Sequence, residues 1–200
     1  MREIMPTRSA ALELADERKL MRQGYEFLDE KRVLLASEML RQLKIYKERS
    51  DRLVALSERA AQALAAAVER HGFDHLQLYP KPQPPQMPPT EQSLFLSLVM
   101  LSAGEPPKVA ADAAAIDPSP EAKACRAAYE VLLWASADLA ARAGNLNRLA
   151  REYRRTERRA RALENVLLPE VDQAIKMVDE QLDMMEREET IRTRWSIGLR

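Results

Sequence analysis

Glycine and aromatic residues are scarce in this chain of 200 residues, which contains 5 Gly and only 5% Phe, Trp and Tyr. A compact domain of this length ordinarily uses more aromatic side chains to fill its core. Charged residues make up 31% of the chain, which exceeds the usual quarter. Ala, Leu, Glu and Arg dominate the composition, as is typical of long helices. We therefore expect an elongated all-α molecule with a narrow core.

The sequence also lacks an excess of charge, a second cysteine and a long apolar run. Lys+Arg and Asp+Glu are both 31, and this balance argues against a nucleic-acid binder. The single Cys125 excludes an internal disulfide and favours a reducing compartment. The longest apolar run, residues 93–103, is too short to span a bilayer as a helix. Because residues 1–35 are charged throughout, we expect no signal peptide and no direct membrane insertion.

Motifs that carry catalysis are missing as well. The sequence has no GxxxxGK[ST], GxGxxG or GxSxG motif. His71 and His75 have the spacing of a metal pair on a helix, but Gly72 separates them and no Cys or carboxylate cluster accompanies them, so a helix-end or loop role is favoured. Cys125 has only Arg126 as a basic neighbour and is expected to be a small, partly buried residue. We predict no catalytic residue, no cofactor and no metal site.

The N-terminal part carries apolar residues in a seven-residue repeat, which predicts a long helix that pairs with a second one. The helix is expected to begin at Thr7, with Thr7 or Ser9 as its cap, and to end near Gly72. Gly24 marks either a close approach of another backbone or a tolerated surface glycine. The four-residue step after Leu35 is interpreted as a stutter of the repeat. The predicted core of this helix is Leu14, Met21, Leu28, Leu35, Met39, Leu43 and Leu53. A second row, one position earlier, is Leu20, Phe27 and Leu34.

The C-terminal part predicts the partner helix. It is expected to begin at Ser119, with Pro120 at the first helical position. Pro169 interrupts the helix and removes one hydrogen bond, after which the apolar repeat resumes in a shifted register. Antiparallel pairing would set Pro169 opposite Leu28–Leu35, so that the two irregularities match. The predicted core of this helix is Leu146, Leu149, Leu163, Leu167, Val171, Ile175, Val178 and Leu182.

The segment between the helices has a different composition, because ten of the 12 prolines lie in residues 73–120. Residues 81–89 predict an extended, polyproline-like stretch. Residues 73–79 alternate like a short strand, and residues 93–101 suit either a strand or a short buried helix. We expect a long antiparallel two-helix coiled coil, made of residues 1–72 and 119–200, with a small proline-rich head or short β-hairpin at residues 73–118.

Basic residues gather in the middle of both predicted helices. Residues 41–52 carry one run and residues 148–161 the other, and antiparallel pairing would place them side by side. One interpretation is a solvated coiled-coil exterior; the other is a site for an acidic partner surface that relieves the repulsion. Nucleic acid fits less well, since only Tyr46 and Tyr153 are available for stacking. The predicted partner-facing set, here named the basic collar, is Arg41, Lys44, Arg148, Arg151, Arg155, Arg158 and Arg159.

Two blocks of sequence resemble one family. The N-terminal stretches PTRSAALEL at residues 6–14 and GYEFLDEKR at residues 24–32 resemble the start of the D subunit of the V-type/A-type rotary ATPases. The stretch RRARALENVLLP at residues 158–169, with the Glu-rich helix that follows, resembles its end. The two blocks together cover somewhat over half of the chain.

The resemblance implies a central-stalk rotor protein that is not itself an enzyme. Its terminal helices would enter a ring of three catalytic and three non-catalytic subunits, and its other end would meet the stalk F subunit and the funnel-shaped subunit over the membrane rotor. It would transmit torque that couples ATP synthesis or hydrolysis in the ring to transport of protons or sodium in the membrane. Such a protein is cytoplasmic and peripheral to the membrane as part of its complex.

Two other functions are compatible with the residues themselves. A non-rotary coiled-coil scaffold or adaptor would form a stable homodimer without other partners. A nucleic-acid binder that uses the arginine run would show salt-dependent binding. Co-purification with three plus three large subunits would favour the rotor instead.

Overall fold

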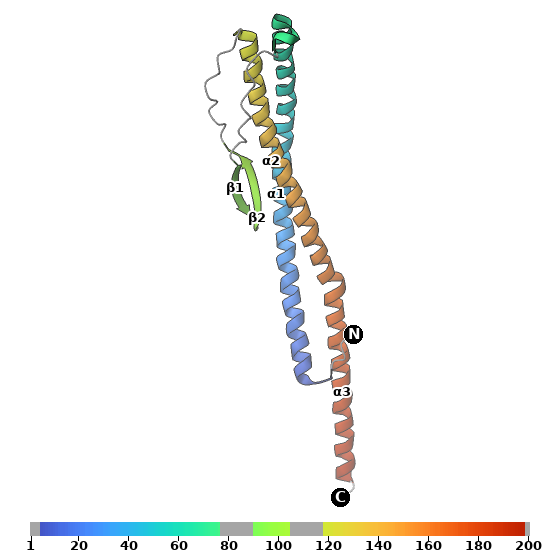
Figure 1. Cartoon of the computed structure of the whole chain (residues 1–200). Coiled ribbons are helices and arrows are strands. Elements are labelled where there is room, and N and C mark those ends of the chain that lie inside the picture. The colour runs from blue at the N-terminus through green and yellow to red at the C-terminus, as the bar shows by residue number, and fades with distance from the viewer. Residues whose placement is uncertain (1–4, 77–89, 105–117, 199–200) are drawn as a thin grey trace. The chain divides into compact units, whose positions relative to one another are not determined.

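A computed structural model describes residues 5–76, 90–104 and 118–198 (Figure 1). The elements in order are α1 (Arg8–Leu76), β1 (Thr90–Phe95), β2 (Leu98–Ala103), α2 (Pro120–Ala162), the π-helical turn η1 (Leu163–Leu167) and α3 (Leu168–Gly198). The predicted class is confirmed, with long paired helices and a central β-hairpin. The chain divides into two compact units, Met1–Ala36 with Glu152–Arg200, and Ser37–Arg151. The three-part division expected from the sequence stays a prediction.

The helix starts are set by hydroxyl caps. The Thr7 hydroxyl accepts a hydrogen bond from the Ala10 N–H at 3.1 Å, so Thr7 rather than Ser9 is the cap of α1. The Ser119 hydroxyl accepts one from the Ala122 N–H at 3.1 Å, directly before Pro120. Each cap satisfies one of the N–H groups that a first helical turn leaves without an intrahelical partner.

The end of α1 differs from the expectation. Gly72 has a φ of 73° and a ψ of 161°, which interrupts the helix where the sequence predicts its end, but a helical stretch follows to Leu76. The expectation of a strand at residues 73–79 is therefore wrong for residues 73–76. Residues 77–79 and the polyproline-like stretch at residues 81–89 lie outside the described residues.

In the first unit, three ion pairs join α1 to the C-terminal helices in antiparallel order. Arg8 pairs with Glu186 at 2.6 Å, Arg18 with Asp172 at 3.4 Å, and Lys31 with Glu152 at 2.6 Å. As the residue numbers rise along α1 they fall along its partner. In the second unit Arg49 of α1 pairs with Asp138 of α2 at 3.7 Å, in the same sense.

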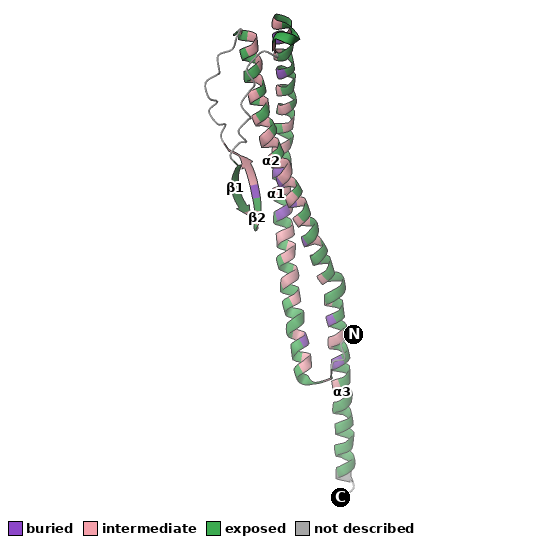
Figure 2. Cartoon of the chain, in the orientation of Figure 1, coloured by how far each residue is buried: buried purple, intermediate pink, exposed green. Residues whose placement is uncertain are grey.

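The seam between the helices is narrow, and Figure 2 shows its buried residues spaced along each helix. Between the caps of α1 and the end of α3, the buried apolar side chains are mostly those that the repeat predicts. Among the predicted core residues, the buried ones are Leu14, Leu35, Leu149, Val171 and Val178. The half-buried ones are Met21, Leu28, Met39, Leu53, Leu146, Leu163, Ile175 and Leu182.

The prediction of Leu43 as a core residue is wrong, since its side chain is 53% exposed. An α-helix that buries Leu35 returns to the same face after seven residues, at Gln42, and turns residue 43 about 100° away. Gln42 is indeed buried, and its side-chain N–H donates to Glu38 at 2.8 Å. The step from Leu35 to Met39 is therefore the ordinary spacing between two rows of one stripe, and the predicted stutter is not needed.

Leu167 is also exposed, because η1 shifts the register of the C-terminal helices. The N–H of Leu168 bonds to the carbonyl of Leu163, five residues back. The π-turn adds one residue, so the more buried residue after it is Leu168, eight positions beyond buried Ala160. Pro169 follows directly and has no N–H to donate, so the altered bonding leaves no donor without a partner there.

The pairing places Pro169 elsewhere than predicted. Asp172 pairs with Arg18, and a Cβ added to Gly24 would lie 3.8 Å from Leu163 Cδ1. Pro169 falls between these two contacts, and so lies along residues 18–24 rather than opposite Leu28–Leu35. The 3.8 Å distance is an ordinary van der Waals contact, so Gly24 leaves room for a methyl group.

The β-hairpin belongs to the second unit. β1 and β2 pair antiparallel from Thr90 with Ala103 to Phe95 with Leu98. The turn residues Leu96 and Ser97 both have positive φ, 46° and 65°, as the two central residues of a type I′ turn require. Met100 on β2 is buried. The hairpin alternative to a proline-rich head is therefore the observed one at residues 90–103.

Candidate partner-binding surfaces

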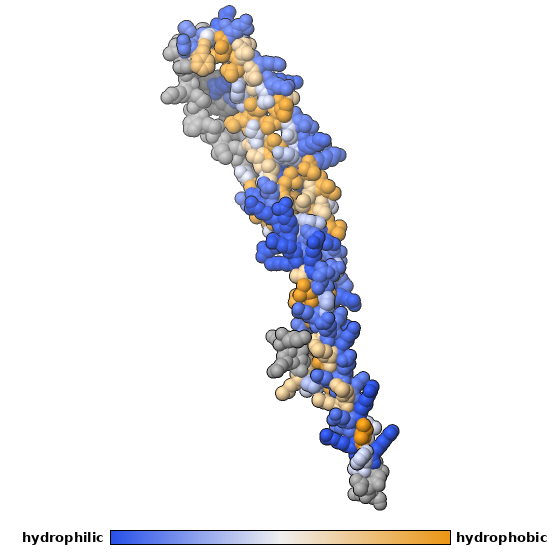
Figure 3. Space-filling model, turned by 90° about the vertical axis from the view of Figure 1, so that its right-hand side faces the viewer, coloured by the Kyte–Doolittle hydropathy of each residue, from blue (hydrophilic) through white to orange (hydrophobic). Residues whose placement is uncertain are grey.

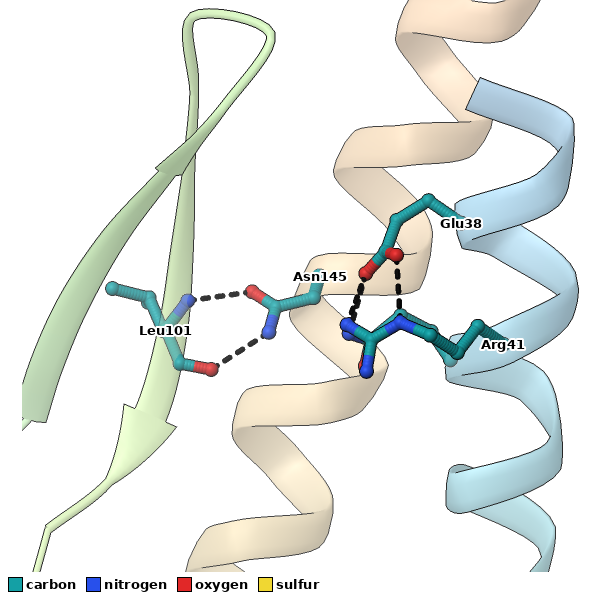
Figure 4. Close-up of polar contacts among 5 residues, drawn as sticks. Glu38, Arg41, Leu101 and Asn145 are labelled. Atoms are coloured by element: carbon teal, nitrogen blue, oxygen red, sulfur yellow. Dashed lines mark hydrogen bonds and ion pairs between the residues drawn. The ribbon is translucent and has the colours of Figure 1, made fainter. Parts of the chain in front are cut away.

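Asn145 of α2 fastens the hairpin to the helix through main-chain bonds (Figure 4). Its side-chain oxygen accepts the Leu101 N–H at 2.8 Å, and its side-chain nitrogen donates to the Leu101 carbonyl at 2.7 Å. Asn145 is 3% exposed, and its oxygen also accepts from Arg148 at 2.9 Å. We name the two bonds to Leu101 the hairpin clamp. A primary amide offers one donor and one acceptor side by side, so it pairs with β2 as a neighbouring strand would.

Sequence reasoning missed the clamp. Asn145 follows Gly144 inside a predicted helix, and both Gly and Asn have low helix propensity. This low helix propensity is the one local sign that Asn145 has a special role. It does not identify the partner Leu101, which is 44 residues away in sequence.

The best-shielded bond between the paired helices of the first unit is the ion pair Lys31–Glu152. Both side chains are about one-fifth exposed, at 19% and 20%. The hydrogen bond from Lys31 holds the pKa of the Glu152 carboxyl below its ordinary 4.5, against a smaller opposing effect of burial, and the charges of Lys31, Arg155 and Arg159 act in the same direction as the bond. Sliding one helix along the other would break this pair.

The depressed pKa of Glu152 predicts a pH-dependent contribution to stability. The contribution is complete above the unfolded-state pKa, near 4.5, and is lost as pH falls through the lower folded-state value. At pH 7, Glu152→Gln is expected to lower the free energy of unfolding by about 1–2 kcal/mol. At pH 3 the difference from the unmodified chain should shrink, as measured by urea unfolding.

A matched control is Glu157→Gln, since Glu157 makes an ion pair within one helix, with Arg161 at 2.6 Å. Such a pair contributes about 0.3–0.5 kcal/mol, so this variant should change stability little at either pH. Equal losses for both variants at pH 7 would contradict a special role for the pair with Lys31.

The basic collar is divided between the two units. Arg41, Lys44, Arg148 and Arg151 belong to one unit, and Arg155, Arg158 and Arg159 to the other. Within the second unit, Arg49 of the first basic run pairs with Asp138, which lies outside the second run.

Members of the collar differ in their engagement. Arg41 binds both carboxylate oxygens of Glu38, at 2.6 and 2.7 Å (Figure 4), and Arg148 donates to Asn145. In the described part of the chain no ion pair engages the remaining members, whose side chains are exposed. These are Lys44, Arg151, Arg155, Arg158 and Arg159. Exposed cations that make no ion pair among the described residues are the ones most available to an acidic partner.

Apolar side chains also reach the surface, and Figure 3 shows several between hydrophilic stretches on the face that it draws. On α1 the row Leu20, Phe27 and Leu34 is exposed, with fractions of 69%, 65% and 50%. The sequence reveals this row, but a repeat alone does not say which of two adjacent rows is buried. The row follows the helix beside its seam.

The predicted absence of a metal site concerns His71 and His75. His71 Nε2 lies 2.5 Å from the Ser119 hydroxyl, and His75 is exposed. Within residues 5–76, 90–104 and 118–198, no three His, Cys, Asp or Glu side chains gather closely enough to hold a metal ion.

Burial raises the pKa of the half-buried Cys125 thiol. Over the same ranges no helix has both the length and the apolar character of a membrane span.

Comparison with known proteins places the chain in one family. The family model for the ATP synthase D subunit matches residues 10–196. The V-type ATP synthase D subunit of Thermotoga neapolitana is 26% identical over 94% of each chain. The A-type ATP synthase D subunit of Pyrococcus abyssi is 28% identical over 95% of this chain and 91% of its own. The V-type D subunit of Anaeromyxobacter dehalogenans is 30% identical over 94% and 92%. The chain therefore belongs to the ATP synthase D-subunit family, the non-catalytic central-stalk component of the V/A-type ATPases.

Proposed function

We propose that this chain is the shaft that transmits torque between the ATP-hydrolysing or ATP-synthesising ring and the ion-conducting membrane rotor of its complex. The observation that carries the proposal is the buried seam of antiparallel helices, whose register within each unit is marked by the cross-helix ion pairs. A shaft works only if its helices do not slide when they are loaded. The seam and the ion pairs oppose sliding in different ways, one by burial and the other by charge.

The proposed partners are three catalytic and three non-catalytic ring subunits around the terminal helices, with the stalk F subunit and the membrane-rotor funnel subunit at the other end. The two helices carry different side chains along their whole length, so one shaft can present different side chains to three equivalent neighbours. The exposed cations of the basic collar suit acidic loops of the ring. Exposed charge pairs are weak and screened by salt, so such contacts can be exchanged as the shaft turns.

Reversing collar charges tests this proposal. The triple variant Lys44→Glu, Arg151→Glu and Arg158→Glu removes cations that make no ion pair in the described residues. With each exposed contact contributing up to about 1 kcal/mol, assembly with the purified ring subunits is expected to weaken on the order of tenfold, and ATP-driven rotation to slow.

The control keeps the charges and exchanges the side chains, as Lys44→Arg, Arg151→Lys and Arg158→Lys. This variant should assemble and rotate like the unmodified chain. Unchanged assembly and torque in the charge-reversed variant would remove the collar from the proposal. Failure of the unmodified chain to assemble with ring subunits, together with a stable homodimer, would favour the scaffold function instead.

A further inference from the structure

The hairpin clamp shows which main-chain groups of the two strands point into the hairpin and which point outward. Leu101 is paired with Gln92 across the hairpin, but both main-chain groups of Leu101 bond to Asn145. In an antiparallel ladder, directly opposed residues alternate between pairs that exchange hydrogen bonds and pairs that do not. Gln92 and Leu101 are therefore a pair without mutual bonds, so the N–H and carbonyl of Gln92 point away from β2.

The same alternation applies two residues to either side. Thr90 and Leu94 also direct their main-chain groups outward, whereas Ser93 and Phe95 direct theirs into the ladder with β2. β2 faces α2 through the clamp, so β1 is the outer strand (Figure 1). In the described residues, no hydrogen bond from another element reaches this outer edge. Among the described residues, the Asn145 side chain bonds to one edge of the hairpin, and no element bonds to the other edge.

In the described residues, the outer edge has few of the features that usually prevent strand pairing. Proteins protect exposed edges with Lys, Pro, bulges or covering elements, and the sequence of β1, TEQSLF, contains neither Lys nor Pro. The register with β2 is regular throughout. Leu94 and its cross-strand neighbour Val99 are 78% and 41% exposed, so an apolar pair lies beside the open main-chain groups.

We propose that the outer edge of β1 binds an extended segment of another subunit of the complex as a third strand. Main-chain bonds to Thr90, Gln92 and Leu94 would supply affinity, and the side chains would supply selectivity. The partner segment would place an apolar side chain beside Leu94 and a Lys or Arg beside Glu91, the only charge on β1. The inference rests on the proposed function, in which a single asymmetric shaft works without a second copy.

Amide hydrogen exchange at single-residue resolution tests the proposal. The free chain is compared with the same chain in the purified ATPase complex. The Gln92 and Leu94 amides are expected to exchange at least tenfold more slowly in the complex. The Ser93 and Phe95 amides serve as internal controls, because β2 already protects them in the free chain and their exchange should change much less.

A variant pair provides the second measurement. Gln92→Pro removes one outward N–H and leaves the bonds to β2, whereas Gln92→Ala keeps the N–H. The proline variant should lose the slow exchange of Leu94 in the complex while Ser93 stays protected, and the alanine variant should retain both.

The remaining outcomes overturn the proposal in different ways. An assembled complex in which Gln92 and Leu94 exchange as in the free chain overturns it and leaves the proposed function intact. Protection of these amides in a concentrated free chain, with the mass of a dimer, replaces the partner by a second copy. A chain that enters no complex overturns both the strand site and the proposed function.

Discussion

Replacing Leu149 with alanine is expected to destabilise the second unit by about 2–5 kcal/mol, the usual cost of truncating a fully buried leucine. Leu149 has no exposed surface. The loss combines the transfer of apolar surface to water with the cavity that remains in a narrow seam. Urea unfolding followed by circular dichroism would show a lower midpoint and a smaller free energy of unfolding.

Leu43→Ala is the matched control, because it makes the same chemical change in the same unit. Sequence patterning predicts both leucines to be in the core, but Leu43 is 53% exposed. Leucine and alanine differ little in helix propensity, so the control should change stability by less than about 1 kcal/mol. If both variants lowered the free energy of unfolding by similar amounts, the assignment of Leu149 to the buried face and of Leu43 to the exposed face would be wrong.

Replacing Asn145 with leucine is expected to release the hairpin from α2. The change leaves the N–H and carbonyl of Leu101 without their partners and deprives Arg148 of an acceptor. The loss of such bonds costs about 1–3 kcal/mol. The Leu101 amide should therefore exchange with solvent about 10–100 times faster, while amides in the middle of α2 keep their protection.

The control for this substitution lies two residues away. Asn147 is exposed and its side chain makes no bond to β2, so Asn147→Leu should leave the exchange of Leu101 unchanged. If Asn145→Leu also leaves it unchanged, apolar packing around Met100 rather than the clamp holds the hairpin.

The helical pairing could be predicted from the sequence because the seven-residue repeat is a local pattern with a direct spatial meaning. The leucines at positions 14, 35 and 149 illustrate this, since their spacing and their burial agree. The repeat is a poorer guide at Leu43, where apolar character favours that residue over the neighbouring Gln42. Helix geometry determines which face is buried, and a polar side chain on that face, such as Gln42, is buried as well.

Tertiary features could not be obtained in this way. The sequence shows that the apolar rows shift near Pro169, but a kink and a π-turn produce the same shift. The clamp joins Asn145 to a main chain, and main-chain bonds leave no trace in the type of residue at position 101. The pairing register within each unit follows from the packing of whole helices, to which single charges contribute little.

The π-turn at Leu163–Leu167 sets where the paired helices of its unit can take up elastic twist. Seven-residue spacing winds two helices into a left-handed supercoil, and an eight-residue spacing locally unwinds it. Rotation in one sense tightens such a supercoil, and rotation in the other loosens it. Under the proposed function, torsional strain is therefore expected to gather at η1 and to differ between the synthesis and hydrolysis directions. Distances between spin labels on either side of η1, measured with the motor driven each way, should change more than those within α3.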